Sequence, residues 1–437
     1  MTLLIISPDY ASHLYPLATL GTAWLAAGER VVVASGPATA GIVGAFGFER
    51  ENLQLGRGSN PGVIRAEQQP AGEDDALRGF FAATRGGMVP TLRFQAQARN
   101  ADLLWNPVAT AHAVRRLVER VQPDQVIVDH LAFSARLALK SAGIRHADVV
   151  LGHPTALTVG EEIYGYPSSW PACFDPDRDE LATLHRLCGD VRDSFTSQWN
   201  DALTLLDAGA DASEDAFTET GDVLLLNYPA ELHGRTRSEL LPEHAFLGSA
   251  VRAEAVDDDV ERWLASSDVP VVYVSFGSFL SVRSDVLARV AEALRGLGVR
   301  VALATGSTRA AELGGVPKSW LVREFLPQVR LLDAAVLAVS HGGNNSVTEA
   351  MTAGVPLLLL PFSTDQFAGA AALDDAGFGL TLDPNTATAG ELREAASRLL
   401  RLDAEPRGRL DRLSASLAGV PGAQRAWETL LGAPAAH

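Results

Sequence analysis

The sequence predicts an α/β protein built from two successive sets of β-α units. In the first half of the chain, a short apolar run at residues 3–6 precedes a loop and a helical pattern, and a second apolar run follows at 31–34. The second half of the 437-residue chain contains further runs of strand length and β-branched content, at residues 271–275, 301–304, 335–339 and 357–360. Strands that alternate with helical patterns are typical of parallel sheets covered by helices, and this length suits two or three domains.

The composition excludes several classes of function. The chain carries 36 Lys and Arg against 53 Asp and Glu, a formal net charge of −17, so it is a poor candidate for binding nucleic acid through phosphate contacts. Its two cysteines, Cys173 and Cys188, indicate neither a disulfide framework nor a zinc cluster. The start of the chain lacks the features of a signal peptide, and no run approaches the roughly 20 apolar residues of a membrane span. We therefore expect a cytoplasmic protein without nucleic-acid or membrane partners.

The first predicted β-loop-α-β unit contains one candidate functional residue. His13 lies in the loop after the first strand, Pro16 suits the first turn of the following helix, and Gly28 lies just past that helix. The unit lacks the G-x-G-x-x-G pattern, so a dinucleotide coenzyme is not predicted. A single histidine in such a loop is most often exposed or bonded within its own turn, so a role for His13 needs support from the rest of the sequence.

The remainder of the first half contains weaker signals. A polar, glycine-rich stretch at 49–73 predicts a long loop, and a helical pattern covers about 75–121. A strand at 126–128 ends in Asp129, which could act in a site at the end of that strand or cap the next helix. We expect 223–226 to be the last strand of this half.

The strongest signal for a site follows the apolar run at 335–339. Residues 341–346 read HGGNNS, and a helical pattern starts at once. A strand, a glycine-rich turn and a helix N-terminus in this order form an anion site, because the backbone N–H groups are free and the helix dipole favours negative charge. The next run, 357–360, brings Asp365 and Gln366 to the same edge of the sheet, where open α/β sheets bind ligands. The segment therefore predicts a site for a phosphate group and a sugar.

The spacing of polar and turn residues in this segment resembles the donor-binding signature of GT-B nucleotide-sugar glycosyltransferases, which include plant secondary-metabolite glucosyltransferases and bacterial antibiotic glycosyltransferases. The resemblance rests on Pro327, Gln328, His341, Gly343, Asn345, Ser346, Glu349, Gly354, Val355, Pro356, Pro361, Asp365 and Gln366. It implies two Rossmann-like domains facing a central cleft. The acceptor domain would span residues 1–240, a linker 241–258 and the donor domain 259–410, and a C-terminal helix at 411–437 would pack back on the first domain.

The same resemblance gives His13 and Asp129 a joint role. The pattern His13-x-x-Pro16 and the helix after it are similar to the family's N-terminal signature, in which this histidine is the catalytic base. The spacing from Pro123 to Asp129 is similar to the context of the carboxylate that orients this base. Ser12 stands where the family usually has Gly, which affects the loop and not the side-chain chemistry.

The resemblance also assigns donor contacts. It implies that Phe325 stacks on the nucleobase, that Gln328 meets the polar edge of the base, and that Asp365 and Gln366 bind sugar hydroxyls. The diphosphate would be held by side chains and one backbone amide, those of Ser278, His341, Asn345, Ser346 and Gly343. Phe325 is smaller than the Trp usual in plant relatives.

Two interpretations of Glu349 stay open. The family places ribose hydroxyls on this carboxylate, but Ser346-x-x-Glu349 also fits a capping box, in which the glutamate serves only the helix start. The aromatic residues of the helical stretch likewise fit either an acceptor pocket or core packing: Phe80, Phe81, Phe94 and Trp105. A loop at 153–174, rich in Gly, Pro and aromatics, is expected over the acceptor site.

The resemblance implies an inverting transfer of a hexose or deoxyhexose from a UDP- or dTDP-sugar to a nucleophile, usually a hydroxyl, of a small natural-product acceptor of aromatic or polyketide type. No metal is expected, since a helix N-terminus would stabilise the leaving diphosphate. A homodimer is compatible with the pattern. Two alternatives remain: another GT-B enzyme such as a nucleotide-sugar epimerase, or a non-catalytic helper of a partner transferase. The presence of His13, Asp129 and Asp365 favours the transferase.

Overall fold

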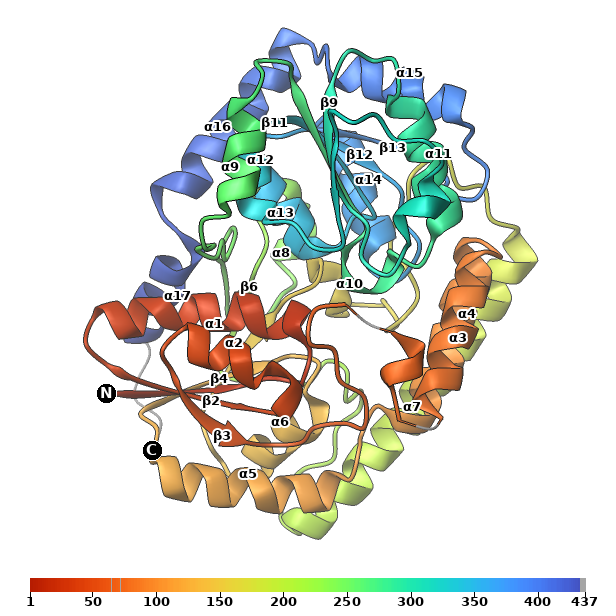
Figure 1. The fold of residues 1–437 in the computed structure, drawn as a ribbon. Helices are drawn as coiled ribbons and strands as arrows, with labels where there is room; N and C mark the ends of the chain where they lie inside the picture. Colours follow the sequence, from red (N-terminus) through yellow and green to blue (C-terminus); the bar gives the residue numbers. More distant parts are fainter. Residues whose placement is uncertain (64, 71, 433–437) are drawn as a thin grey trace.

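Two parallel β-sheets, each covered by helices on both faces, form the protein (Figure 1). The computed structural model describes residues 1–63, 65–70 and 72–432. The first sheet has seven strands in the order β3-β2-β1-β4-β5-β6-β7, and the second has six in the order β10-β9-β8-β11-β12-β13. All neighbouring strands in both sheets run parallel. The predicted α/β fold with two Rossmann-like domains is confirmed.

The first sheet is made of β1 (Thr2–Ile6), β2 (Arg30–Ser35), β3 (Glu49–Asn52), β4 (Gln125–Asp129), β5 (Ala147–Val150), β6 (Val223–Leu226) and β7 (His244–Phe246). The helices of this part of the chain are α1 (Ala11–Ala26), α2 (Ala40–Ala45), α3 (Glu73–Thr84), α4 (Met88–Asp102), α5 (Pro107–Val121), α6 (Phe133–Ser141), α7 (Arg178–Leu206) and α8 (Arg235–Ser238). Strand β1 is buried on both faces, because α1 and α2 cover one face of the sheet and α5 and α6 the other.

The second sheet is made of β8 (Val271–Ser275), β9 (Arg300–Ala304), β10 (Leu321–Arg323), β11 (Ala335–Ser340), β12 (Leu357–Leu359) and β13 (Gly379–Thr381). Its helices are α9 (Asp258–Ala265), α10 (Gly277–Leu280), α11 (Ser284–Leu294), α12 (Gln328–Ala334), α13 (Asn344–Thr352), α14 (Gln366–Ala376), α15 (Ala389–Leu399) and α16 (Ala404–Gly419). Helices α11 and α15 pack on one face, and α12, α13 and α16 on the other.

The last described helix, α17 (Gly422–Leu431), packs against the first domain. Figure 1 shows α17 beside α1, and Trp427 meets the Trp24 ring edge-on at 5.0 Å between ring centroids. Ala426 and Leu430 are buried in the same core as the first strand. The amide of Gln125 donates to the Leu430 carbonyl at 2.8 Å, so polar contacts also hold α17 in place.

Several predicted boundaries are wrong. The helical stretch at 75–121 is three helices, because Gly86 and Gly87 interrupt it and a second break precedes Pro107. The predicted loop at 49–73 begins with β3, an edge strand whose sequence EREN has no apolar pattern to reveal it. Strand β7 follows the predicted last strand of the first half and consists of three half-buried residues, too few to show a period. The predicted C-terminal helix at 411–437 is, within the described residues, the end of α16 and the separate helix α17, which are divided at Pro421.

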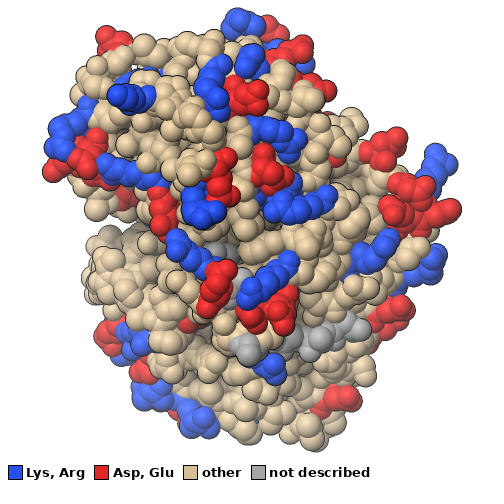
Figure 2. All heavy atoms as spheres, turned by 45° about the vertical axis from the view of Figure 1, so that its right-hand side comes forward, with Lys and Arg blue, Asp and Glu red and all other residues tan. Residues whose placement is uncertain are grey.

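The face of the molecule in Figure 2 shows acidic and basic side chains interspersed over both domains. Many of these charges are paired, as in the contacts of Arg323 with Asp257 and Asp259 at 2.9 and 2.8 Å. This face therefore lacks the extended basic patch that a phosphate backbone would need. Among the helices that the structure describes, none has the length and apolar character of a membrane-spanning segment.

Candidate active site

A cavity of about 730 Å³ lies between the two domains, at the carboxyl ends of the central strands of both sheets. This is the edge at which open parallel sheets bind ligands. Eleven of the twelve residues singled out from the sequence line the cavity: His13, Asp129, Ser278, Phe325, Gln328, His341, Gly343, Asn345, Ser346, Asp365 and Gln366. Glu349 does not line it and lies behind Gln328.

His13 and Asp129 form a close polar pair in the cavity. The Nδ1 atom of His13 lies 2.6 Å from Oδ2 of Asp129, whose side chain is completely buried. The other carboxylate oxygen accepts a hydrogen bond from the Leu131 backbone at 2.8 Å. Asp129 does not cap α6, since that helix starts after Ala132 without a side-chain cap, so the capping interpretation is wrong. With Nδ1 bound to the carboxylate, Nε2 of His13 is the nitrogen left to act on a ligand.

The pair is electrostatically coupled. Burial alone would lower the pKa of His13, but the charge and hydrogen bond of Asp129, with a contribution from Asp365, raise it above its ordinary value. Burial likewise opposes ionisation of Asp129, yet the charge of His13 lowers the pKa of that carboxyl. The arrangement keeps Asp129 ionised and favours a proton on the imidazole.

The predicted loop position of His13 is wrong in detail. Helix α1 begins at Ala11, so His13 lies in its first turn and Pro16 lies inside the helix. Pro16 has no N–H, and the Ser12 carbonyl one turn earlier therefore lacks its usual helical donor. The amide of Asn345 in the second domain supplies a donor to that carbonyl at 2.8 Å.

The start of α13 forms an anion-binding corner. Gly343 is the residue before the helix, and no side chain caps the helix start, so the first N–H groups are available to a ligand. His341 packs so closely that a Cβ on Gly343 would lie 2.5 Å from its ring, and a Cβ on Gly277 2.9 Å. Burial lowers the pKa of His341 to about 4, so the ring is neutral near pH 7, and its Nδ1 has no partner among the described residues.

Two other polar residues of this corner contact the first domain. Asn344 donates to the carbonyls of Leu151 and Asn227, at 2.8 and 2.9 Å. Ser278 in α10 accepts a hydrogen bond from the Asn60 amide at 3.2 Å. None of these three contacts could be predicted from local sequence, because the partners lie 117 to 218 residues away in the chain.

Glu349 is held in a buried polar cluster. Its oxygens accept hydrogen bonds from Arg252 at 2.8 Å and from the Gln328 amide at 2.6 Å. Burial raises the pKa of Glu349 more than these partners lower it. The capping box is absent, since α13 starts at Asn344 and Ser346 is already its third residue. Arg252, which also lies 5.1 Å from the Tyr15 ring, was missed because the predicted linker carries no pattern.

The two side chains predicted to bind the sugar, Asp365 and Gln366, differ in how much of their hydrogen-bonding capacity is already used within the protein. Asp365 lines the cavity and accepts a 2.6 Å hydrogen bond from the backbone of His153 in the first domain and a 2.8 Å bond from the Thr364 hydroxyl. Gln366 is buried, and its amide is bonded to the backbone of Phe362 and Ser363 in its own loop. In this state Gln366 shapes the loop, while Asp365 faces both domains.

Phe325 lies at the mouth of the cavity with 61% of its surface exposed. An aromatic ring so exposed is costly to solvate and is available to stack on a planar group. Its neighbour Glu324 forms an ion pair with Arg65 of the first domain. The second domain is therefore connected to the first at this mouth as well.

The first-domain side of the cavity is aromatic. Phe80 and Phe94 line it, together with Tyr164 and Tyr166 from the loop at 153–174. Phe81 packs beside Phe80 and Leu77, and Trp105 lies away from the cavity, so those two do not line a pocket. Within the part of the chain that the structure describes, no cluster of His, Cys, Asp or Glu could hold a metal ion.

Residues 196–411 match the family model of UDP-glucoronosyl and UDP-glucosyl transferases. This segment belongs to that family. It begins within α7 and contains the whole second sheet, including every donor-site residue above. The resemblance of this transferase segment to nucleotide-sugar glycosyltransferases is therefore confirmed.

Parts of the chain are also similar in sequence to curated glycosyltransferases. An NDP-glycosyltransferase YjiC of Bacillus licheniformis is 24% identical over 284 residues, which are 64% of this chain and 65% of that relative. The demethyllactenocin mycarosyltransferase of Streptomyces fradiae is 32% identical over 35% of this chain and 33% of its own. The matched segments thus span a third to just under two thirds of these relatives.

Solved structures match over nearly the full length. Spinosyn forosaminyltransferase SpnP superposes with a TM-score of 0.69 at 19% identity, covering 99% of this chain and 98% of the other. The glycosyltransferase VinC in complex with dTDP superposes with a TM-score of 0.65 at 20% identity, covering 99% and 98%. At these identities the match establishes the GT-B fold of this chain.

Proposed function

We propose that the protein is an inverting glycosyltransferase. It moves a hexose or deoxyhexose from a UDP- or dTDP-sugar to a nucleophile, usually a hydroxyl, of a small natural-product acceptor. The observation that carries this proposal is the His13–Asp129 pair, which lines the same cavity as the uncapped start of α13. A base and an anion-binding corner facing one space are what transfer from a sugar diphosphate requires.

The chemistry follows from the two parts. Nε2 of His13 takes the proton of the acceptor hydroxyl while the oxygen attacks the anomeric carbon, and the bond from that carbon to the diphosphate oxygen breaks on the opposite face. Asp129 fixes the tautomer of His13 and stabilises the imidazolium that forms. The nucleoside diphosphate leaves with the bonding electron pair, and the configuration at the anomeric carbon inverts.

The leaving diphosphate would be bound by neutral hydrogen-bond donors. The free N–H groups after Gly343 and the neutral ring of His341 can donate to phosphate oxygens, and Asn345 and Ser346 lie on the same turn. The orphaned Nδ1 of His341 supports this assignment, since a buried ring nitrogen without a partner is costly. Phosphate oxygens would supply the missing hydrogen bond.

The nucleoside and sugar would bind on either side of this corner. Phe325 stacks on the base at the cavity mouth, and Gln328 meets its polar edge. Ribose hydroxyls would reach Glu349 by replacing the Gln328 amide at its Oε2 atom. Asp365 would accept hydrogen bonds from sugar hydroxyls, with Gln366 beside it.

The aromatic wall favours a flat or hydrophobic acceptor, of aromatic or polyketide type. The names of the compared proteins support the proposed donor and acceptor. An NDP-glycosyltransferase and a glycosyltransferase in complex with dTDP support a nucleotide-sugar donor, and a demethyllactenocin mycarosyltransferase supports a small-molecule acceptor. The reaction would need no resident cofactor, because the nucleotide sugar is a co-substrate.

A donor screen tests the proposal. Purified protein is incubated with UDP- and dTDP-sugars, with and without aromatic or polyketide acceptors, and the nucleoside diphosphate and glycoside are measured. We expect release of nucleoside diphosphate from at least one donor, faster with acceptor, and a product of inverted anomeric configuration. Isomerised nucleotide sugar without release would indicate an epimerase, and stimulation of another transferase without release would indicate a helper; either result overturns the proposal.

A further inference from the structure

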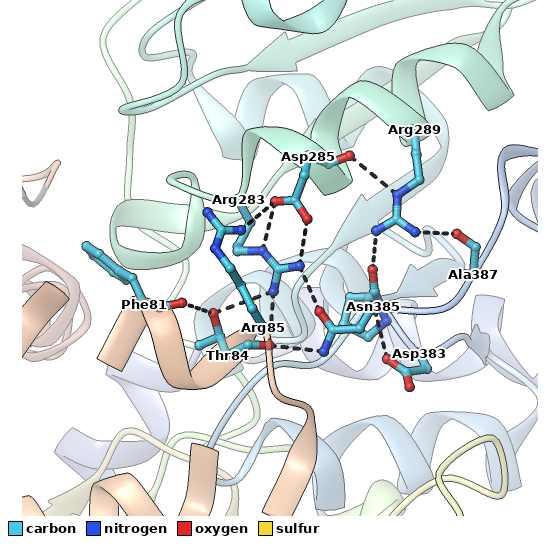
Figure 3. Close-up of polar contacts among 10 residues, drawn as sticks. Phe81, Thr84, Arg85, Arg283, Asp285, Arg289, Asp383, Asn385 and Ala387 are labelled. Atoms are coloured by element: carbon cyan, nitrogen blue, oxygen red, sulfur yellow. Dashed lines mark hydrogen bonds and ion pairs between the residues drawn. The ribbon is translucent and has the colours of Figure 1, made fainter. Parts of the chain in front are cut away.

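The C-terminus of α3 in the first domain is bonded by side chains of the second domain. The Thr84 carbonyl, at the end of that helix, accepts hydrogen bonds from Arg283 at 3.1 Å and from the Asn385 amide at 3.0 Å (Figure 3). Carbonyl groups in the last helical turn lack partners within the helix and carry partial negative charge. A guanidinium and an amide from the other domain therefore supply hydrogen-bond donors to the C-terminus of α3.

Arg283 is buried, and each of its three guanidinium nitrogens donates a hydrogen bond. Its side chain is 1% exposed, and two of its nitrogens donate to Asp285 at 2.9 and 2.8 Å. It also donates to the Asn385 carbonyl oxygen at 2.7 Å. Burial raises the pKa of Asp285, but hydrogen bonds and charges of Arg283 and Arg85 lower it to about 2, so the carboxylate is ionised. A buried charge paired so completely is expensive to place elsewhere.

The same guanidinium reaches the loop beneath the candidate sugar site. Arg283 stands 5.0 Å from the centre of the Phe362 ring. The backbone of Phe362 donates to the Gln366 side chain, and Asp365 lies between these two residues in the chain. Arg283 therefore touches both the end of α3 and the loop that carries Asp365.

Helix α3 forms one wall of the cavity on the acceptor side. Its residues Leu77 and Phe80 line the cavity and pack against Phe279 of the second domain. Beyond the helix end, Arg85 donates to Asp285 at 3.1 Å. The wall is thus fixed to the second domain by an apolar contact near its middle and a polar one at its end.

We propose that Arg283, together with Asn385, is a positioning residue that ties the α3 wall to the Phe362–Gln366 loop. This coupling rests on the proposed function. It keeps the acceptor against the bound sugar and keeps water away from the anomeric carbon. When the tie is loosened, acceptor binding weakens and a larger share of the sugar goes to water, whose proton passes to His13 as that of an acceptor would.

The variant Asn385→Asp tests this with little disturbance of the fold. It keeps the oxygen that accepts from Arg283 and replaces the group that donates to Thr84 with one that cannot donate. Arg283→Lys is the second variant, because it retains a charge but loses the forked contacts. Arg289→Ala is the matched control, since Arg289 lies beside the cluster but its hydrogen bonds to the described residues go only to carbonyls of its own domain, those of Asp285, Pro384 and Ala387 (Figure 3).

Four quantities are measured in each variant: the acceptor KM, the ratio of nucleoside diphosphate released to glycoside formed, hydrogen exchange of the α3 amides, and the affinity for the bare nucleoside diphosphate. We expect the acceptor KM to rise about five- to tenfold in Asn385→Asp and Arg283→Lys, the effect of one or two hydrogen bonds. The release ratio and α3 exchange should rise with it, while affinity for the bare nucleotide stays within about twofold of wild type. Arg289→Ala should leave all of these at wild-type values, even where its Tm falls.

The outcomes separate this inference from the proposed function. Normal transfer by the wild type, with unchanged KM, release ratio and α3 exchange in both variants, overturns the coupling alone. The same changes in Arg289→Ala also overturn it, because they would then reflect general loosening of the second domain. No transfer by the wild type from any donor overturns the proposed function and, with it, the coupling.

Discussion

The amide of Asn345 in the second domain donates a hydrogen bond to the Ser12 carbonyl in the first, at 2.8 Å. That carbonyl is one turn before Pro16, whose missing N–H leaves it without a helical donor. His13 is the next residue, so the position of the candidate base depends on the start of α13, where the diphosphate is proposed to bind. The contact between the two domains and the position of the candidate base are thus linked through Ser12.

The Asn345–Ser12 contact predicts a double-mutant effect. Asn345→Ala should lower kcat about fivefold, through the loss of roughly 1 kcal/mol. Pro16→Ala restores an N–H that can bond to the Ser12 carbonyl within α1, so the same Asn345 change should cost less in that background. Steady-state kinetics of the four proteins measure the coupling. Equal losses in both backgrounds would show that Asn345 acts on the donor alone.

His13→Ala should lower turnover with a hydroxyl acceptor by about 10²–10⁴-fold, because the proton then has no positioned acceptor. Binding of the nucleoside diphosphate should change little, which calorimetry checks. The acceptor must be one that is not ionised at the assay pH, since an ionised acceptor needs no base. Near-normal turnover with such an acceptor would refute the assignment.

The pH profile should report the His13–Asp129 pair. A base must be neutral, so kcat/KM falls as the pH drops through the pKa of His13, which Asp129 raises above the ordinary 6.5 against the effect of burial. The acidic limb should therefore lie at higher pH than for a free imidazole. In Asp129→Asn the raising charge is gone and burial remains, so the limb should move to lower pH while kcat falls. A limb that stays in place would mean that another group titrates.

Glu349 should affect both donor affinity and stability. Glu349→Gln weakens ribose binding, and it also leaves Arg252 without a charged partner at this position, which should cost about 1–3 kcal/mol. Isothermal titration with the nucleoside diphosphate and the Tm are measured side by side. Arg252→Met is the control for the second effect, since it removes the pair from the other end. A loss of Tm at unchanged nucleotide affinity would leave Glu349 a structural role only.

Asp365→Ala should cut kcat/KM at least about tenfold, since charge-assisted hydrogen bonds to sugar hydroxyls contribute roughly 1.5–3 kcal/mol each. The loss should be smaller for a donor that lacks the contacted hydroxyl. Affinity for the bare nucleoside diphosphate should stay near wild type, because that product carries no sugar. An equal fall in nucleotide affinity would show that Asp365 acts mainly through its bond to the His153 backbone.

The features predicted correctly from the sequence are those that depend on neighbouring residues in the chain, such as strands and tight turns. Strands such as β1 and β11 are apolar runs, and the turn at 341–346 places Gly343 where His341 leaves no room for a Cβ. The start of α1 was misplaced because Pro16 favours a helix start, and the rule cannot foresee a donor from another domain. Arg252 was missed for a similar reason, since its partner Glu349 is 97 residues away.

The docking of α17 on α1 makes the chain's last described helix part of its first domain. During synthesis the ribosome must deliver the entire second domain before Trp24 receives its cover, so the amino-terminal half emerges with an open apolar flank. Chimeras that exchange the first domain between proteins of this fold therefore need three segments, not two. A grafted first domain must be accompanied by residues 422–431 of the same protein. Otherwise the last helix of the other protein would pack on an α1 surface that is not complementary to it.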